Sequence, residues 1–201
     1  MNISFKLLEN ETEMEKVINL RHKVFVEEDG YPPEAIKNTY DNKAIHFIAT
    51  KGKEVIGCVS VILSGSKSLP FEDFIDLSPY KGEKIAEVQK LAIIPEERKG
   101  IAAVGLMLLS YEFIKKNGYN KICIFSLEKK TDNIRLYKRL GFKIIDKFKF
   151  YNVGNALAMI LDMNKDSVYE KEKDKRKLKE YFIAKKLSDA INSIINLKIN
   201  E

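Results

Sequence analysis

The stretch that most constrains this chain is residues 87–119, EVQKLAIIPEERKGIAAVGLMLLSYEFIKKNGY. Its pattern predicts an apolar strand that Pro95 ends, a charged turn, and a long helix that is apolar on almost every side. We expect the helix to begin at Arg98 and end at Asn117, with Gly118 as its C-terminal cap. A strand that enters a helix through a turn with free backbone N–H groups can bind an anion. The sequence therefore predicts an anion site at this turn.

With 201 residues, 45% of them hydrophobic, the chain has enough material for one sizeable domain with its own core. Cys58 and Cys123 lie in apolar, strand-like runs, which favours buried thiols in a reducing compartment, although a disulfide stays open. No apolar run approaches the ~18 residues of a membrane helix, and the N-terminus lacks the pattern of a secretory signal. We therefore expect a cytoplasmic protein without a membrane span.

The formal charge of +6 is spread unevenly. Residues 165–201 hold ten Lys and Arg against seven Asp and Glu. Because the two kinds are interleaved and no aromatic platform accompanies them, they favour a solvated helix face over a nucleic-acid patch. Residues 27–41 are acidic instead, with Lys37 as their one cation. Two His and two Cys scattered singly do not have metal-ligand spacing, so we expect neither a nucleic-acid partner nor a metal site.

Hydrophobic patterns divide the chain into strands, helices and loops. Strands are predicted at residues 3–8, 44–50, 54–63, 85–94, 121–127, 142–151 and 156–163. The second and third of these, and the last two, read as hairpins. Thr12 and Glu15 form a capping box that opens a helix, and Thr131 and Gly141 bound a shorter helix that carries Tyr137.

Arg21 falls on the apolar stripe of the first helix, between Ile18 and Phe25. A guanidinium on a core-facing stripe is costly unless it is paired. It is therefore either functional or a long side chain that reaches solvent from the helix edge, and we weigh these two interpretations equally. His46 lies alone within a predicted strand, so we interpret it as structural.

Two motifs carry a family resemblance. The first is residues 91–98, LAIIPEER, followed by the long helix that ends at Gly118, and the second is residues 136–142, LYKRLGF. With this order of elements, residues 3–163 resemble the GNAT superfamily of N-acyltransferases. The resemblance implies an α/β (α+β) fold in which helices flank a mixed, mostly antiparallel sheet of six or seven strands. We therefore expect a GNAT-like domain at residues 1–164 and a C-terminal helical extension at residues 165–201.

In that superfamily the turn after the long strand reads Arg/Gln-x-x-Gly-x-Gly/Ala, and its backbone amides hold the pyrophosphate of coenzyme A. Laid on this chain without gaps, the motif falls on Arg98, Ile101 and Ala103, so isoleucine stands at the first glycine position. Lys99 and Gly100 can still supply a positive charge and an open turn, which Ala102 completes. The resemblance thus assigns acetyl-CoA or another acyl-CoA to residues 98–103.

A thioester donor implies roles for further residues. An amine acceptor is mostly protonated at neutral pH, so a base must take its proton. Glu87 is our candidate base, with an ordinary surface carboxylate as the alternative. The superfamily commonly uses a tyrosine at the position of Tyr137 to protonate the departing thiolate, and the alternative is a core tyrosine. Backbone amides around Leu91, Ala92 and Ile93 would polarise the acyl carbonyl.

A narrower pattern resembles acyl-homoserine-lactone synthases and the related long-chain N-acyl amino acid synthases. Four residues match those that surround the acceptor amine and the acyl donor there: Arg21, Phe25, Asp41 and Glu87. The resemblance implies substrate binding by the first three of them, while Lys90 replaces an arginine of the pattern. This branch often takes acyl groups from acyl carrier protein and often has a degenerate pyrophosphate turn, which would explain Ile101.

These resemblances imply an enzyme that moves an acetyl group from acetyl-CoA to a primary amine of a small molecule or peptide by direct attack. A second expectation has a longer acyl chain, taken from acyl-CoA or acyl carrier protein, and an amino-acid-like acceptor. The acidic residues 27–41 would then attract a cationic amine, unless they form an ordinary solvated loop. A third is a non-catalytic acyl-CoA-binding or assembly module, with a homodimer formed through the C-terminal helix.

Overall fold

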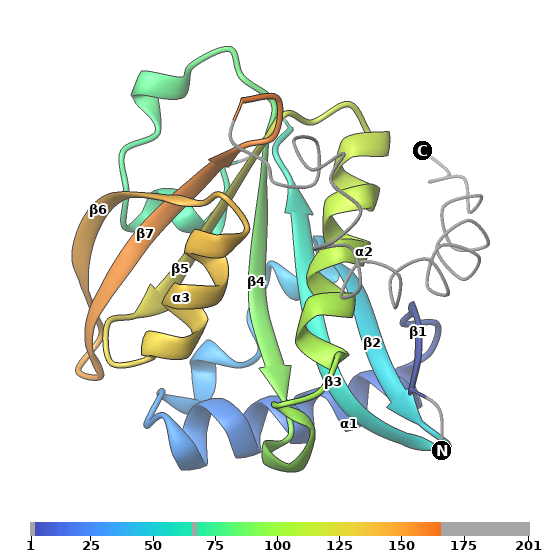
Figure 1. The fold of residues 1–201 in the computed structure, drawn as a ribbon. Helices are drawn as coiled ribbons and strands as arrows, with labels where there is room; N and C mark the ends of the chain where they lie inside the picture. Colours follow the sequence, from blue (N-terminus) through green and yellow to red (C-terminus); the bar gives the residue numbers. More distant parts are fainter. Residues whose placement is uncertain (1–2, 66–67, 166–201) are drawn as a thin grey trace.

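The computed structural model describes residues 3–65 and 68–165, in which helices flank a seven-stranded sheet (Figure 1). The strands are β1 (Ile3–Leu7), β2 (Ile45–Lys51), β3 (Glu54–Leu63), β4 (Ile85–Ile93), β5 (Lys121–Leu127), β6 (Lys143–Phe150) and β7 (Gly154–Asp162). Their order is β1-β2-β3-β4-β5-β7-β6, and every neighbouring pair is antiparallel except β4 and β5. The expected mixed, mostly antiparallel sheet is therefore confirmed. The predicted helix beyond residue 165 lies outside the described residues.

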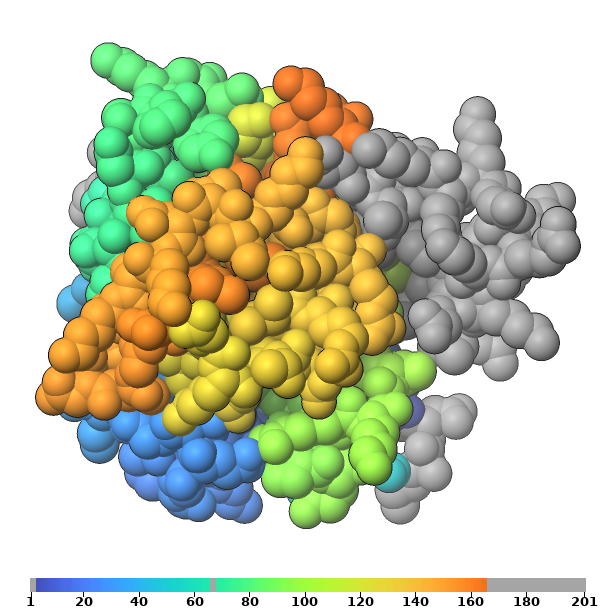
Figure 2. Space-filling model, turned by 60° about the vertical axis from the view of Figure 1, so that its left-hand side comes forward, coloured from blue at the N-terminus to red at the C-terminus, as the bar shows by residue number. Residues whose placement is uncertain are grey.

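The α-helices of the described chain cover both faces of the sheet. α2 (Ala102–Lys116) and α3 (Thr131–Arg139) lie on one face. α1 (Glu11–Arg21) lies on the other and continues as a π-helical segment (His22–Glu28) (Figure 1). In the view of Figure 2, α3 and β6 occupy the middle of the surface, with the insertion between β3 and β4 (residues 68–84) on one side and α1 on the other. Elements far apart in sequence therefore lie side by side on this face.

The predicted start of α1 is wrong. Asn10, not Thr12, is the N-cap, because its side chain accepts a 3.0 Å hydrogen bond from the Glu13 amide. The Glu13 carboxylate in turn accepts from the amide of Glu9 at 3.0 Å. Reciprocal capping therefore exists, but two residues before the predicted box.

The other two helix starts also differ from the prediction. α2 begins at Ala102 rather than Arg98, because a 3-10 turn (Pro95–Glu97) and a further turn come first. In α3, Thr131 is the first helical residue, and its N-cap, Lys130, makes no side-chain capping bond. Both helix ends close as predicted, since Gly118 and Gly141 adopt φ values of 75° and 99°.

The main core lies between α2 and the sheet. Leu106, Leu109 and Ile114 are fully covered, as expected for a helix that is apolar on most sides. Gly105 permits the closest approach, because a Cβ there would lie 2.4 Å from the ring of Phe5 on β1. This contact packs the edge strand β1 directly against α2.

β4 and β5 separate soon after they pair. Their parallel register covers only three positions, the last of which joins Glu87 to Cys123. β4 also contains a bulge, because Ser60 pairs with Gln89 while Cys58 pairs with Ala92. Two residues of β4 therefore face one residue of β3. The divergence and the bulge lie at the same level and open the middle of the sheet.

Both cysteines are buried and free, as one of the two sequence interpretations expected. Among the residues that the structure describes, no helix is both long and apolar enough to span a membrane.

Candidate active site

A cavity of about 140 Å³ lies where β4 and β5 diverge. Its walls come from the π-helical segment and the loop after it, the 3-10 turn Pro70–Asp73, β4, β5 and α3. Ile124 packs in the core on the α2 face, whereas its neighbour Phe125 packs on the opposite face, and both line the cavity. The cavity is therefore reached from both faces of the sheet.

Glu87 lines this cavity from the last position at which β4 pairs with β5. Its side chain is 1% exposed, and Oε2 accepts a 2.9 Å hydrogen bond from the Phe71 amide. Oε1 has no partner among the described residues. Burial raises the pKa of Glu87 to about 8. A carboxyl group with a pKa near neutrality and one free oxygen is suited to proton transfer.

Gln89 is a polar lining residue that sequence reasoning missed. It lies two positions after Glu87 and so faces the same side of the strand. Its Nε2 is buried and has no partner among the described residues. The period of two from Glu87 was the signal that could have identified it. The cavity therefore offers a free donor beside the free oxygen of Glu87.

Tyr137 projects from α3 into the cavity and is 3% exposed. Burial raises its pKa, so the phenol keeps its proton at neutral pH. Tyr31, which sequence reasoning did not single out, also lines the cavity, and burial raises its pKa as well. Its ring stacks on Phe25 with centroids 5.3 Å apart. The structure thus places the predicted Phe25 in the wall of the cavity.

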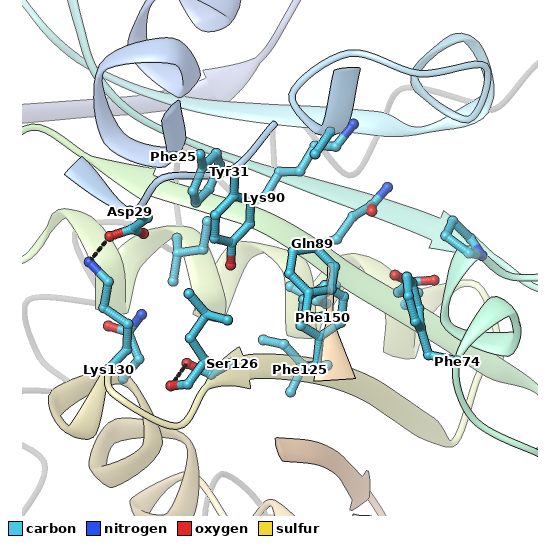
Figure 3. A pocket seen from close by; sticks show the side chains of 18 of the residues that line it. Phe25, Asp29, Tyr31, Phe74, Gln89, Lys90, Phe125, Ser126, Lys130 and Phe150 are labelled. Carbon is cyan, nitrogen blue, oxygen red and sulfur yellow. Dashed lines mark hydrogen bonds and ion pairs between the residues drawn. The ribbon is translucent and has the colours of Figure 1, made fainter. Parts of the chain in front are cut away.

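An aromatic wall closes one end of the cavity (Figure 3). Phe74 from the insertion, Phe125 from β5 and Phe150 from β6 meet with ring centroids 4.9–6.2 Å apart. The ion pair between Asp29 and Lys130 lies at the other end. The wall was not foreseen, because it depends on β6 and β5 both pairing with β7.

Arg21 and Asp41 lie behind the cavity rather than in its lining. Arg21 is fully buried, which excludes a side chain that reaches solvent. Its guanidinium donates to Asp41 Oδ1 at 2.7 Å, and Lys90 Nζ lies 2.6 Å from Asp41 Oδ2. Burial alone would raise the pKa of Asp41, but the charges of Arg21 and Lys90 hold it below its ordinary value. Only Lys90 of these three lines the cavity.

His46 is structural, as expected. Its Nδ1 lies 2.8 Å from Ser60 Oγ, which also accepts from Arg21 at 2.6 Å, and its Nε2 lies 2.9 Å from the carbonyl of Asp41. Burial lowers the pKa of His46, so the ring is neutral and adds no further charge to this cluster.

The structure has a turn at residues 98–101, before α2, and the side chain of Arg98 is engaged elsewhere. Arg98 Nε donates to the Ile93 carbonyl at 3.1 Å, and its guanidinium pairs with Glu28 at 2.6 Å. Ile101 is the N-cap of α2, packs against the core and makes no side-chain capping bond. The first amides of a helix lack intrahelical acceptors, so they remain available to an anion. Lys99 and Gly100 are exposed beside them.

The remaining predicted cofactor residues divide between the cavity and the core. Leu91 lines the cavity, whereas Ala92 and Ile93 are buried beside it. Ala102 is fully covered, and Ala103 packs against the same core.

The acidic segment 27–41 is largely neutralised by the protein itself. Glu28 pairs with Arg98, and Asp29 pairs with Lys130. Asp41 is held by two cations. This pairing favours the ordinary-loop interpretation over attraction of a cationic amine.

A family model described as N-acyl amino acid synthase FeeM matches residues 16–164, which is more than half of the chain. An uncharacterized N-acetyltransferase of Schizosaccharomyces pombe is 28% identical over 91 residues. That match covers 45% of this chain and 56% of the yeast protein, so the chain spans about half the length of this relative.

Solved structures show the same fold. FeeM, an N-acyl amino acid synthase from uncultured soil microbes, superposes with a TM-score of 0.71 at 21% identity, over 85% of this chain and 96% of that one. NAA60 of Arabidopsis thaliana in complex with acetyl-CoA superposes with a TM-score of 0.61 at 18% identity, over 81% and 99% of the chains. At such identities the likeness supports the fold alone.

Proposed function

Because the chain belongs to the FeeM N-acyl amino acid synthase family and is a GNAT-type N-acyltransferase, we propose that it transfers an acyl group from coenzyme A to an amino-acid-like primary amine. The observation that carries this proposal is Glu87, a buried carboxyl group with one free oxygen in a cavity between two diverging strands. NAA60, which shares the fold, binds acetyl-CoA.

The donor enters from the face that carries α2 and α3. Its pyrophosphate is held by the first-turn amides of α2 and by Lys99, and its thioester arm passes between β4 and β5. This route is supported by the cavity, which is lined from both faces of the sheet at the point of divergence.

The acceptor approaches from the opposite face and loses a proton to Glu87. The free amine attacks the thioester carbonyl, so a C–N bond forms while the developing oxyanion is stabilised by main-chain amides of the β4 bulge. When the C–S bond breaks, the thiolate takes the proton of Tyr137, and the phenolate regains a proton, through solvent, from the nitrogen of the new C–N bond, which must lose one to become an amide. Glu87 then releases its proton, which balances the cycle.

A side chain beside Glu87 supports an acceptor with a polar group near its amine. Gln89 presents an amide donor that has no partner among the described residues. A carboxylate or amide oxygen of an amino-acid-like acceptor would satisfy this donor, which otherwise stays buried without a partner.

The size of the cavity favours a short acyl group. A cavity of roughly 150 Å³ binds a molecule the size of benzene, and the volume here is similar. Acetyl is therefore the first candidate. The second candidate is a longer acyl chain, delivered by acyl-CoA or acyl carrier protein. The aromatic wall of Phe74, Phe125 and Phe150 favours it, because this wall offers apolar surface beside the thioester.

A thermal-shift panel of free coenzyme A with its acetyl, octanoyl and palmitoyl thioesters tests both candidates. At equal concentration, a ligand that binds only the folded state raises the melting temperature more the more tightly it binds. The largest shift with acetyl-CoA supports the short donor, and a shift that grows with chain length supports the long one. The absence of a shift with all four ligands would contradict the coenzyme A proposal.

A further inference from the structure

The bulge in β4 contains a residue in an unfavourable conformation. Lys90 adopts φ = 55°, one of two positive φ values among the described non-glycine residues. For a residue with a Cβ, this left-handed conformation is less favourable than the right-handed one. Such strain persists only where the surrounding structure imposes it. The question is which contacts impose it on Lys90.

Two contacts with charged side chains hold the two strands at the bulge, one on β4 and one on β3. On β4, the Lys90 ammonium lies 2.6 Å from Asp41 Oδ2. On β3, Ser60, the partner of the residue just before Lys90, accepts a 2.6 Å bond from Arg21. Arg21 and Asp41 are themselves paired at 2.7 Å. A continuous chain of polar contacts therefore runs from β3 through α1 and its following loop to β4.

Arg21 and Asp41, the two central residues of this series of contacts, also bind the main chain. Arg21 also donates to the Ile36 carbonyl at 3.2 Å, and Asp41 Oδ2 accepts from the Asn38 amide at 2.8 Å. Arg21 is 0% and Asp41 5% exposed, and both carboxylate oxygens of Asp41 are occupied. Neither residue lines the cavity, so neither is placed to contact a substrate.

We propose that Arg21 and Asp41 are positioning residues, which with Lys90 form a clamp that holds the β4 bulge in shape. The bulge leaves a residue outside the ladder with β3, at the point where β5 has already diverged, so its main-chain amide can turn toward the cavity. The inference rests on the proposed function, in which that amide stabilises the oxyanion. It changes the expected role of Arg21 and Asp41 from substrate contact to backbone placement.

Lys90→Gly and Lys90→Ala test the clamp against direct use of the ammonium. Glycine adopts positive φ without strain, so the bulge persists when the anchor is lost, whereas alanine keeps the strain and loses the anchor. Asp41 keeps Arg21 and the Asn38 amide as partners in both variants, so neither leaves it unpaired.

Thiol release from acetyl-CoA and octanoyl-CoA is measured with a mixture of the twenty amino acids. We expect kcat of Lys90→Gly to stay within about threefold of the wild type, and kcat of Lys90→Ala to fall roughly tenfold or more while KM for the thioester stays nearly constant. Equal losses in the two variants would show that the ammonium itself acts, and full activity in both would show that the bulge needs no anchor. Either result overturns the proposal.

Melting temperatures give a second readout that does not depend on a substrate. Lys90→Gly should melt higher than Lys90→Ala, the reverse of the usual order in a strand. Lys149 is an exposed residue on β6 and supplies the control variants. There the protein with Lys149→Gly should melt at a lower temperature than the protein with Lys149→Ala. If the order at Lys90 follows the order at Lys149, the clamp is wrong. If the wild type releases no thiol, the proposed function fails for these donors while the melting comparison still decides the clamp.

Discussion

The main-chain amide of Phe71 donates a 2.9 Å hydrogen bond to Oε2 of Glu87. This contact joins the insertion before β4 to the proposed base and leaves Oε1 without a partner among the described residues. The 3-10 turn that carries Phe71 is itself capped, since Glu72 accepts a 2.7 Å bond from the Leu69 amide. The insertion therefore orients the carboxyl group by one fixed oxygen and keeps the other available.

The rate of acyl transfer should rise with pH as Glu87 ionises. Burial places its pKa at about 8, so at pH 6 the base form is scarce and its fraction increases almost tenfold per pH unit until it levels above pH 8. Glu87→Gln should abolish this dependence and lower kcat/KM by roughly 10²-fold or more. Initial rates between pH 6 and 9 measure this pH dependence. The control is Glu96→Gln, which changes an exposed carboxylate outside the cavity. A profile that is the same in Glu87→Gln and wild type would remove Glu87 from the mechanism.

The same pKa makes stability depend on pH. Between the ordinary value of 4.5 and about 8, the folded state binds a proton at Glu87 that the unfolded state has released, so wild-type stability falls as pH rises through this window. Glutamine keeps an oxygen for the Phe71 amide but does not ionise. The stability of Glu87→Gln relative to the wild type should therefore grow by roughly 1.4 kcal/mol per pH unit within that window. Urea unfolding at pH 5 and pH 8 checks this, and a difference that does not change with pH would argue against the buried carboxyl.

Much of the fold was predictable because its strands are enclosed on both faces. The strands β3, β4 and β5 are buried along most of their length, so their apolar runs marked them clearly. The start of α2 was not predictable to the residue, because Pro95 begins a 3-10 turn whose composition is compatible with a helix. The capping residue of α1 was missed because Asn10 and Thr12 both suit an N-cap, and only backbone geometry separates them.

The site was predictable as separate residues but not as an arrangement. Glu87, Tyr137 and Phe25 line one cavity, while their roles as base, acid and substrate contact stay predictions. The pairing of Arg21 with Asp41 depends on how the loop after the π-helical segment folds back over α1, which no local pattern encodes. The β4 bulge is equally invisible, because it is a shift in the register between β3 and β4, which no local pattern of β4 encodes.

Tyr137→Phe should lower kcat with little change in KM, because the hydroxyl acts only as the thiolate departs. Phe fills the same buried space, so the melting temperature should stay close to that of the wild type. Tyr80→Phe, outside the cavity, is the matched control. A thioester of a more acidic thiol needs no proton on departure and should recover much of the lost rate. A loss that is equally large with both donors would instead indicate a structural role.

Gly105→Ala should destabilise the protein although alanine is the better helix former by about 1 kcal/mol. The new Cβ would lie 2.4 Å from the ring of Phe5, so the edge strand must shift, at a cost of roughly 1–3 kcal/mol. Gly65→Ala, where no atom lies within 4 Å of the added Cβ, should be neutral. Thermal unfolding compares the two variants, and Phe5→Leu should restore part of the loss. A more stable Gly105→Ala protein would show that α2 packs less closely on β1.

The central claim is that this protein forms an amide from an acyl thioester and an amine, with Glu87 as the base. Mass spectrometry of the products formed from acetyl-CoA or octanoyl-CoA and a mixture of the twenty amino acids tests it most directly. We expect an N-acylated amino acid with the wild type and its loss with Glu87→Gln, while Glu96→Gln still forms it. The absence of any N-acylated product with the wild type, or an undiminished yield with Glu87→Gln, would contradict the account.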